Sequence, residues 1–406
     1  PCTSSSTPTI ISSTSASSTS TTTSTTTSST SVTSTTTSSS STSKTTSTST
    51  STTTSTTTST TTSACNLFFN QTTYSAVAQP WSVAVIDVNN DNKSDIIVAN
   101  YNSNNVGVLL NTGNGTFSAQ TTYPVGTNPA SVAVVDVNSD SKPDIIVANS
   151  GSNNVGVLLN IGNGTFHAQT TYSAGGQPWS VAVVDVNSDN KPDIIVANYH
   201  SNNVSVLFNA GNGIFNAQTT YPVGTGPWSV AVVDVNTDNK PDIIVANYVS
   251  NTVSVLLNTG NGIFNAQTLY SVTSGPISVA VVDVNNDNKS DIIVANFDSA
   301  NIGVLLNGAN GTFNAQTTYP VGTNPVSVAV VDVNSDNKPD IIVANFGSNN
   351  IGVLLNAGNG TFNAQTTYSV GFNPISVAVV DMNSDNKLDI TYANSGSNNV
   401  GILLNS

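Results

Sequence analysis

Seven short segments hold nearly all of the chain's acidic side chains, in a spacing that suits metal coordination. Each reads Asp-x-Asn-x-Asp-x-Lys-x-Asp, and together they contain 21 of the 22 acidic residues, with Asp298 as the exception. Side-chain oxygens at positions 1, 3, 5 and 9 and the backbone carbonyl at position 7 follow the first part of the EF-hand ligand pattern, which predicts one Ca²⁺ per segment. The predicted ligands, with each Lys contributing only its backbone carbonyl, are Asp87, Asn89, Asp91, Lys93, Asp95, Asp136, Asn138, Asp140, Lys142, Asp144, Asp185, Asn187, Asp189, Lys191, Asp193, Asp234, Asn236, Asp238, Lys240, Asp242, Asp283, Asn285, Asp287, Lys289, Asp291, Asp332, Asn334, Asp336, Lys338, Asp340, Asp381, Asn383, Asp385, Lys387 and Asp389.

The net charge of the chain agrees with this interpretation. Each segment carries three Asp and one Lys, so seven segments at −2 each account for the formal net charge of −14. Seven Ca²⁺ ions would neutralise it, whereas three carboxylates crowded together without a cation repel one another. The alternative is an Asx-rich turn that caps its own backbone. Three carboxylates and one Asn predict a modest affinity, with a Kd of about 10⁻⁴–10⁻³ M, as in extracellular calcium modules.

The segments belong to an internal repeat of 49 residues. The sequence Asp-Ile-Ile-Val-Ala-Asn begins at Asp95 and recurs six more times at this spacing. The only substitutions in it are Thr391 and Tyr392 in the last copy. Seven periods account for residues 64–406, so the array has an integral number of units and no atypical terminal repeat. A solenoid normally needs capping repeats, whereas a closed ring does not. The repeat therefore favours a propeller, with an open β-solenoid as the second architecture.

One unit contains four candidate strands and no helical periodicity. In the unit that starts at Trp179, we expect strands over residues 180–185, 193–197, 204–208 and 215–221, with a turn at 211–213. Four antiparallel strands in 45 to 50 residues is roughly the size of one propeller blade. The fold class predicted is all-β, a seven-bladed β-propeller of four-stranded blades with essentially no helix.

The two ends of the repeat region indicate how the ring closes. Residues 68–74 match the fourth strand, and the chain stops after residues 400–405, which match the third strand. We therefore expect the first strand of this region to complete the last blade. Loops between first and second strands should share one face with the 211–213 turns, and the other connections should lie opposite.

Residues 1–63 differ from the rest of the chain in composition. They are Ser or Thr apart from eight residues, which leaves too little apolar surface for a folded core. We expect a disordered, O-glycosylated, mucin-like stalk, with an unmodified linker as the alternative. Cys2 and Cys65 bracket this segment, and their pairing is left open. No apolar run of membrane-spanning length occurs. Because the chain begins at Pro1 rather than Met, we expect that a signal peptide was removed or never included.

The motifs of each unit resemble those of a known family. Phe-x-x-Ala-Gln-Thr-Thr-Tyr, Pro-x-Ser-Val-Ala-Val-Val-Asp and Asp-Ile-Ile-Val-Ala-Asn, together with the aspartate segment, are similar to FG-GAP-like (VCBS-type) repeats over residues 64–406. Similar repeats build the calcium-loaded propeller of integrin α subunits and of some fungal lectins, which implies calcium at the positions above and adhesion or sugar binding. Two departures stand out. Position 6 of the segment is Asn or, once, Ser141 rather than Gly; we expect a sharp left-handed turn there, which Asn tolerates best among residues other than Gly. The Phe-Gly and Gly-Ala-Pro tripeptides of integrins are absent, so integrin-like partners are not implied.

Aromatic residues vary between units on the face opposite the aspartate segments. Aromatic side chains there can stack on sugar rings while nearby Asn and Ser form hydrogen bonds, and packing is the alternative role. The candidate ligand-binding residues are Tyr101, Tyr199, His200, Tyr248, Trp81, Trp179 and Trp228.

These observations predict a secreted or cell-surface calcium-binding module for adhesion or recognition, with a glycan or a cell-surface or matrix protein as partner. A spacer or coat protein without a specific ligand is the alternative. Eight Asn-x-Ser/Thr sequons would suit such a glycoprotein. A calcium-dependent hydrolase or lyase is the least favoured, because the chain has no Glu, no Arg and only two His, in non-equivalent positions. We expect no enzymatic activity and, without a basic patch, no nucleic-acid binding.

Overall fold

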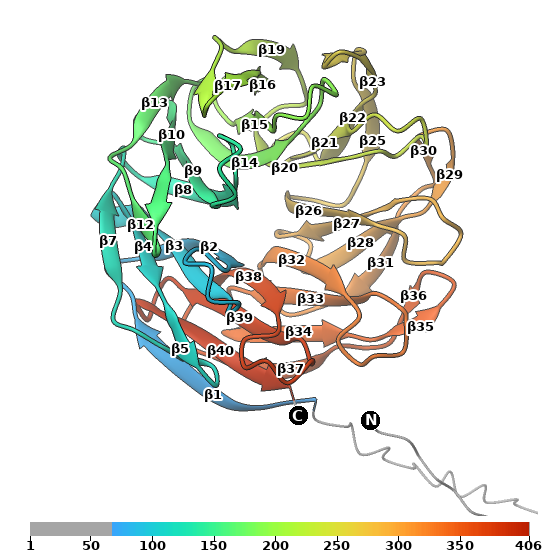
Figure 1. Ribbon diagram of the computed structural model, residues 1–406. Coiled ribbons are helices and arrows are strands. Elements are labelled where there is room, and N and C mark those ends of the chain that lie inside the picture. Colours follow the sequence, from blue (N-terminus) through green and yellow to red (C-terminus); the bar gives the residue numbers. More distant parts are fainter. Residues whose placement is uncertain (1–66, 406) are drawn as a thin grey trace, which may run out of the picture. The chain divides into compact units, whose positions relative to one another are not determined.

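The computed structural model describes residues 67–405, and four-stranded antiparallel sheets arranged around a central axis make up this part (Figure 1). There are seven such sheets, so the predicted seven-bladed propeller is confirmed. The predicted stalk at 1–63, Cys2 and Cys65 lie outside the described residues. One short 3₁₀ turn, η1 (Tyr101–Ser103), is the single helical element among residues 67–405. The part of the chain that the structure describes contains no helix with the length and hydrophobicity needed to cross a bilayer.

The first strand of every blade lies next to the axis, where it contacts the first strands of both neighbouring blades. These strands are β2 (Pro80–Ile86), β8 (Pro129–Val135), β14 (Pro178–Val184), β20 (Pro227–Val233), β26 (Pro276–Val282), β32 (Pro325–Val331) and β38 (Pro374–Val380). The second strands, which are β-branched on both faces and fully buried, are β3 (Asp95–Asn100), β9 (Asp144–Asn149), β15 (Asp193–Asn198), β21 (Asp242–Asn247), β27 (Asp291–Asn296), β33 (Asp340–Asn345) and β39 (Asp389–Asn394).

The third and fourth strands complete each blade outward from the axis. The third strands are β4 (Asn105–Leu109), β10 (Asn154–Leu158), β16 (Asn203–Leu207), β22 (Thr252–Leu256), β28 (Asn301–Leu305), β34 (Asn350–Leu354) and β40 (Asn399–Asn405). The outer strands are β7 (Thr121–Pro124), β13 (Thr170–Ser173), β19 (Thr219–Pro222), β25 (Thr268–Ser271), β31 (Thr317–Pro320), β37 (Thr366–Ser369) and β1 (Phe68–Ser75).

The prediction of one continuous fourth strand over residues 215–221 is wrong in the extent of the strand. In blade 3 the chain first forms a separate hairpin, and only Thr219–Pro222 pairs with the third strand. The hairpin is held away from the blade because its first residue, Asn209, is bonded to Asp193 and to the preceding blade, as described below. The hairpin strands are β5 (Asn111–Gly113), β6 (Thr116–Phe117), β11 (Asn160–Gly162), β12 (Thr165–Phe166), β17 (Asn209–Gly211), β18 (Ile214–Phe215), β23 (Asn258–Gly260), β24 (Ile263–Phe264), β29 (Asn307–Ala309), β30 (Thr312–Phe313), β35 (Asn356–Gly358) and β36 (Thr361–Phe362).

The hydrophobic core lies between adjacent blades. Between blades 3 and 4, for example, Ile195 of β15 belongs to one buried cluster with Val230 of β20 and Ile243 of β21. Each fully buried Val or Ile stabilises the fold by about 1.5–3 kcal/mol relative to an exposed one. Because both faces of every second strand are used in this way, each blade depends on its two neighbours, and the ring must close.

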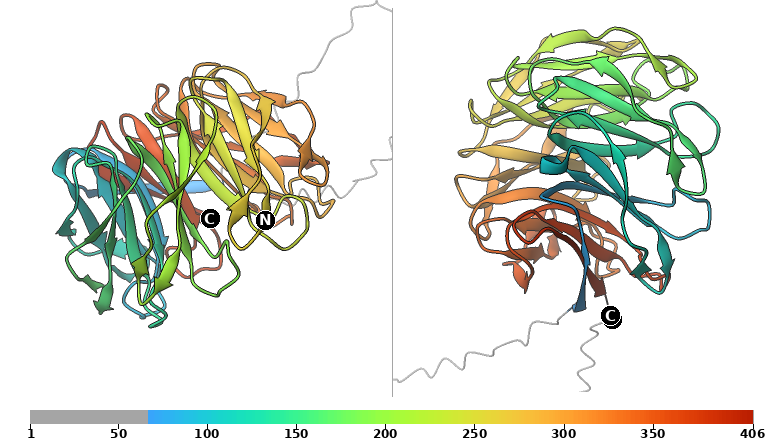
Figure 2. Two further views of the ribbon diagram at one scale, coloured as in Figure 1. Left: turned by 90° about the horizontal axis from the view of Figure 1, so that it is seen from above. Right: turned by 90° about the vertical axis from the view of Figure 1, so that its left-hand side faces the viewer.

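Closure uses the N-terminal strand, as the sequence predicted. β1 pairs antiparallel with β40, so that residues from the two ends of the described chain form one blade (Figure 1). An edge-to-face contact between Tyr368 and Phe68, with ring centroids 5.3 Å apart, joins the sixth blade to β1. The same Tyr–Phe contact links each of the six remaining pairs of neighbouring blades, with ring centroids 5.2–5.4 Å apart. The circle of blade-to-blade contacts is therefore complete. Figure 2 shows the ring from two further sides.

Candidate metal centre and ligand-binding face

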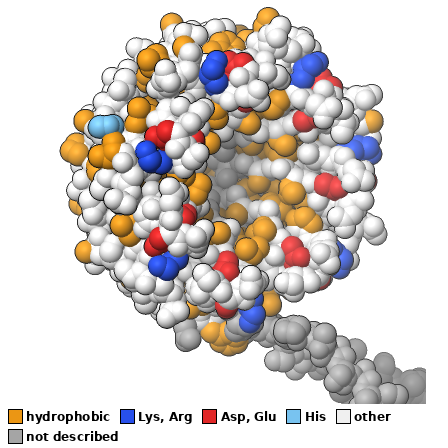
Figure 3. Space-filling view, viewed as in Figure 1, with side chains coloured by type: hydrophobic (Ala, Val, Ile, Leu, Met, Phe, Trp, Pro, Cys, Tyr) orange, Lys and Arg blue, Asp and Glu red, His pale blue; other side chains and the backbone are white. Residues whose placement is uncertain are grey.

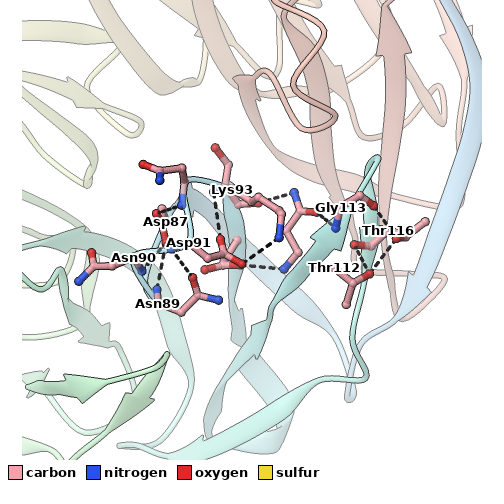
Figure 4. A network of polar contacts seen from close by, with 12 residues as sticks. Asp87, Asn89, Asn90, Asp91, Lys93, Thr112, Gly113 and Thr116 are labelled. Atoms are coloured by element: carbon pink, nitrogen blue, oxygen red, sulfur yellow. Dashed lines mark hydrogen bonds and ion pairs between the residues drawn. The ribbon is translucent and has the colours of Figure 1, made fainter.

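The aspartate segments form the loops between the first and second strands, all on one face of the propeller. Their Asp and Lys side chains surround a central hollow on this face (Figure 3). In blade 1 the loop joins β2 to β3, and the Gly113 turn of the nearby hairpin lies beside Lys93 (Figure 4). The expectation that the loops and the glycine turns share a face is therefore confirmed.

The first Asp of each loop organises the loop backbone. In blade 1, Asp87 Oδ1 accepts hydrogen bonds from the N–H groups of Asn89, Asn90 and Asp91 at 3.1, 2.7 and 3.3 Å, and Oδ2 accepts one from Asn92 at 2.7 Å. The N–H groups of four successive residues, at positions 3 to 6, thus point toward one carboxylate. These bonds fix the loop shape and account for the Asp at position 1 with or without a metal.

Two residues in each loop adopt the left-handed backbone conformation. Position 6 was expected to do so, and Asn92 (φ 61°) and Ser141 (φ 63°) confirm it. Position 4 does the same, which the sequence analysis missed, and in blade 4 this residue is the β-branched Thr237 (φ 63°). A β-branched residue is strained in this region, so the loop bonds must offset the cost.

Positions 3, 5 and 7 supply the remaining oxygens of the loop. Asn89 Oδ1 accepts the Asp91 N–H at 3.0 Å, and Asp91 Oδ1 accepts the Lys93 N–H at 3.0 Å. Lys93 Nζ forms an ion pair with Asp91 Oδ2 at 3.2 Å, and five other loops repeat this pair. Their side chains are more than one third exposed, so each pair adds at most about 1 kcal/mol and could yield to a cation.

The last Asp of each loop is fully buried and has a different set of partners. Asp95 Oδ2 accepts the Val88 N–H at 3.0 Å, and Oδ1 accepts the Asn111 N–H at 2.7 Å. Burial raises the pKa of Asp95 to about 6, the Asn111 and Val88 bonds oppose the shift, and the nearby Asp91 and Asp87 carboxylates add to it. The pKa of the equivalent residue in each other blade is raised to about 6 for the same reasons.

Hydrogen bonds through these buried aspartates connect each loop to the next blade. Val88, which donates to Asp95, accepts through its carbonyl a 2.9 Å bond from Asn160 Nδ2 in blade 2. The backbone N–H of Asn160 in turn donates to Asp144 Oδ1 at 2.7 Å. The same three bonds recur in every blade.

The chain of bonds closes on itself at the last blade. Met382 O accepts a 2.9 Å bond from Asn111 Nδ2, and the Asn111 N–H donates to Asp95. We call this closed circle the aspartate ring. The Asn at the start of each hairpin was not among the residues predicted from the sequence, although its recurrence after every third strand was a signal that could have identified it.

The loop chemistry fits Ca²⁺ in its donor types. Each carboxylate oxygen of Asp91 and Asp95 accepts one hydrogen bond in the loop, which leaves lone pairs for a cation. Burial is the main cause of the raised pKa of Asp95, and the neighbouring Asp91 and Asp87 carboxylates add to it, a contribution that a cation among them would offset. Within residues 67–405, however, no three His, Cys, Asp or Glu side chains are gathered tightly enough to hold a metal ion. A calcium ion would therefore rely on Asn89 and the Lys93 carbonyl, or draw the carboxylates inward.

The seven buried carboxyls predict that the metal-free protein loses stability as pH rises. Their folded-state pKa values, about 6, lie above the ordinary 3.8 of Asp, so the protonated form favours the folded state. This stabilisation is fully present below about pH 4 and is lost as pH rises through 6. Thermal melts of metal-free protein should therefore show a higher Tm at pH 5 than at pH 8. A matched series with saturating calcium should be flatter, and a metal-free Tm that climbs steadily from pH 5 to 8 would contradict the prediction.

The aromatic candidates lie together at the opposite face. Trp179 and Trp228 stack with ring centroids 4.7 Å apart, and Tyr101 is parallel to Trp179 at 6.0 Å. Trp81 stacks on Tyr101 at 4.7 Å. All seven candidate residues belong to one connected group, which we call the aromatic cluster: Trp81, Tyr101, Trp179, Tyr199, His200, Trp228 and Tyr248. Packing and ligand binding are both consistent with it, because every member keeps some exposed surface.

Two polar features border the aromatic cluster. Asp298, the acidic residue outside the loops, faces Tyr248, and burial followed by the negative charge of Asp298 raises the pKa of the Tyr248 hydroxyl. His200 lies against Tyr199, with ring centroids 5.5 Å apart. His167, by contrast, follows the blade 2 hairpin on the loop face, so the two histidines do not meet.

Comparisons with known proteins identify the repeat and the fold. The family profile described as an FG-GAP-like repeat matches residues 87–147, 136–196, 185–245, 234–294, 283–343 and 332–392. A comparison with curated proteins gave no match. Among solved structures, an Agrocybe aegerita lectin that recognises non-reducing terminal N-acetylglucosamine is similar, with 22% identity, TM-score 0.54, and coverage of 72% of this chain and 80% of that one.

Other similar structures have unrelated activities. The virginiamycin B lyase of Staphylococcus aureus has 14% identity, a TM-score of 0.57, and coverage of 82% of this chain and 98% of its own. The hydrazine synthase of Kuenenia stuttgartiensis has 14% identity, a TM-score of 0.57, and coverage of 81% and 96%. At such identities these likenesses concern the propeller fold alone.

Proposed function

Because this chain belongs to the FG-GAP-like repeat family, we propose that it is an extracellular calcium-binding module that recognises glycans. The observation that carries the proposal is the division of the propeller into two faces. One face carries the regular aspartate loops, identical in type in every blade, and the other carries an irregular aromatic cluster. Regularity suits a structural role, and irregularity suits recognition.

Calcium would act on the loop face. Each loop carries three carboxylates and an Asn within nine residues, and the negative charge of the seven loops equals in magnitude the charge of seven divalent ions. A bound cation would offset the carboxylate repulsion that adds to the effect of burial on the pKa of the last Asp in each loop. Since Asp95 also belongs to the aspartate ring, a cation on its loop would reinforce contacts between blades. The modest affinity expected for such sites suits a compartment rich in calcium, which supports secretion or display at a cell surface.

Glycan recognition is supported by the chemistry of the opposite face. Indole and phenol rings present flat apolar surfaces to the C–H faces of sugars, while their polar atoms can form hydrogen bonds. No His–acid pair is available for proton transfer in the described part of the chain, which favours binding over catalysis. A calcium-dependent hydrolase or lyase would need a metal site open to its substrate, and the aspartate loops lie on the face opposite the aromatic cluster. An adhesive contact with a cell-surface or matrix protein could use the same aromatic face.

A spacer or coat protein without a specific ligand is the second candidate. The near identity of the units favours it, because a recently expanded array need not have acquired a ligand. This candidate predicts no binding to glycans or cells, with or without calcium.

A glycan array of the full chain with calcium tests the proposal. Binding to a defined group of glycans is expected, and the double variant Tyr199→Ala, Tyr248→Ala should lose at least about tenfold in affinity, because each ring contributes apolar contact. Ile214→Ala, at an exposed residue on the hairpin side, is the matched control and should bind as the parent does. Circular dichroism should confirm that all variants fold. An array without any binding would favour the spacer instead.

A further inference from the structure

A pocket lies on the propeller axis at the end away from the aspartate loops. Its volume is about 140 Å³, and two consecutive residues from the start of every first strand line it. The first of the two is a Trp in three blades, Trp81, Trp179 and Trp228, and a smaller apolar residue in the other four. The second is Ser in all seven blades. None of the lining residues is charged.

The seven serines form a ring of hydroxyl groups with a fixed orientation. Each Ser Oγ accepts a hydrogen bond from a Val N–H of the next blade, as Ser180 does from Val230 at 3.2 Å. The series closes where Ser376 accepts the Val83 N–H at 3.1 Å. Because the oxygen is the acceptor in each bond, the hydroxyl proton is free to donate. No group among residues 67–405 accepts it, so the pocket holds up to seven unused donors.

The indoles make one wall of this pocket aromatic. Blade 2 has Ala130 at the equivalent position, and this small residue lets Trp81 and Trp179 approach to 5.8 Å across it. Trp228 continues the stack with an interplanar angle of 8° to Trp179. Trp179 Nε1 is buried without a hydrogen-bond partner among the described residues. The opposite wall, from Ile277 to Ile375, is aliphatic.

We propose that this axial pocket binds a single neutral sugar ring at the end of a glycan. The inference rests on the proposed glycan recognition and specifies where it occurs and what it accepts. Sugar oxygens can accept from the serine hydroxyls, while the C–H face of the ring packs on the indoles. A charged ligand is disfavoured because no opposite charge lines the pocket. The volume is below the roughly 300–1,000 Å³ of sites that enclose drug-sized ligands, so one ring is the largest group that fits.

The axial position has a consequence for stoichiometry. A site between blades could recur up to seven times, whereas the axis passes through the ring once. Each chain should therefore bind one terminal sugar. The chain has three Trp residues, all in this wall, so tryptophan fluorescence reports on a ligand that enters the pocket.

The experiment titrates the full chain, in calcium, with N-acetylglucosamine, galactose, mannose and fucose in separate series, and follows tryptophan fluorescence and heat. At least one neutral sugar should give a saturable fluorescence change with one site per chain. Glucuronic acid, the charged control, should bind at least about tenfold more weakly. Trp228→Ile should weaken binding about tenfold, and this variant installs the residue that blades 5 and 7 carry at the same position. Ile214→Thr, at an exposed residue on the hairpin side, is its matched control; it installs the residue that blades 1, 2, 5 and 6 carry at that position and should bind as the parent does.

The outcomes separate this inference from the proposed function. Suppose that the chain binds glycans on the array. The axial site would then be overturned, and glycan recognition would remain, if titration gives several sites per chain, if tryptophan fluorescence does not change, or if Trp228→Ile binds with full affinity. An array without binding would overturn both. If Trp228→Ile fails to fold, the stoichiometry and fluorescence of the unaltered chain decide the question.

Discussion

Removal of calcium is expected to lower the Tm of this protein by on the order of 20 °C, the largest effect that we predict. With a Kd of about 10⁻⁴–10⁻³ M per site, free calcium at about 10 mM stabilises the folded state by about 1.4–2.7 kcal/mol per site. For seven independent sites the total is on the order of 10–19 kcal/mol. In a domain of this size each kcal/mol shifts Tm by about 1.5 °C.

The measurement is a set of thermal melts and protease digestions in chelator and in increasing calcium. The Tm should rise with the logarithm of calcium concentration above the Kd, because the stabilisation is a mass-action effect. Magnesium at the same concentration is the control for ionic strength, and it should have a smaller effect because it demands a stricter octahedral geometry. A metal-free sample with unchanged Tm and unchanged protease resistance would leave the loops as Asx turns without a calcium role.

The substitution Asp193→Ala is expected to destabilise the protein by on the order of 2–4 kcal/mol even without calcium. Two buried N–H groups, those of Val186 and Asn209, lose their acceptor, and each unsatisfied group costs about 1–3 kcal/mol. Burial of the Asp193 carboxylate is unfavourable and raises its pKa to about 6. Removal of this buried charge offsets part of the loss. The aspartate ring is also broken between blades 3 and 4.

Asp189→Ala is the matched control in the same loop. Asp189 is partly exposed, and its ion pair with Lys191 is worth at most about 1 kcal/mol. Denaturant unfolding in chelator should therefore separate the two variants, and calcium titration should show that both lose affinity at this loop. Equal stabilities in chelator would mean that the buried Asp serves only as a metal ligand and that the aspartate ring contributes nothing to folding.

The repeat and its closure could be predicted from the sequence because their causes are local. The β-branched run at 193–197 indicates a strand buried on both faces, and the 49-residue period fixes the blade. The match between residues 68–74 and the later fourth strands indicated closure, which the pairing of β1 with β40 confirms. The left-handed turn at loop position 6 was likewise readable, because Asn tolerates this conformation better than other residues with a side chain.

The boundary between hairpin and outer strand was decided by contacts between blades. Residues 215–221 have strand character throughout, yet the hairpin strand β18 ends at Phe215 and the outer strand of the blade, β19, begins only at Thr219. Asn209 bonds to Asp193, 16 residues earlier, and to the Val137 carbonyl, 72 residues earlier in the preceding blade. No local pattern encodes the second partner, since it comes close only when the blades are stacked around an axis.

The sequence by itself determined the strands, the loops and the number of blades, because hydrophobic alternation and turn chemistry act over a few residues and repeat at every period. Only the tertiary structure decided that Trp81, Trp179 and Trp228 meet in one aromatic wall, that seven serines face the same pocket, and that the buried aspartates join into one circle. The physical reason is that a closed ring brings equivalent positions of different repeats to one axis. The distances between those positions depend on the radius of the ring and on the sizes of the side chains in neighbouring blades.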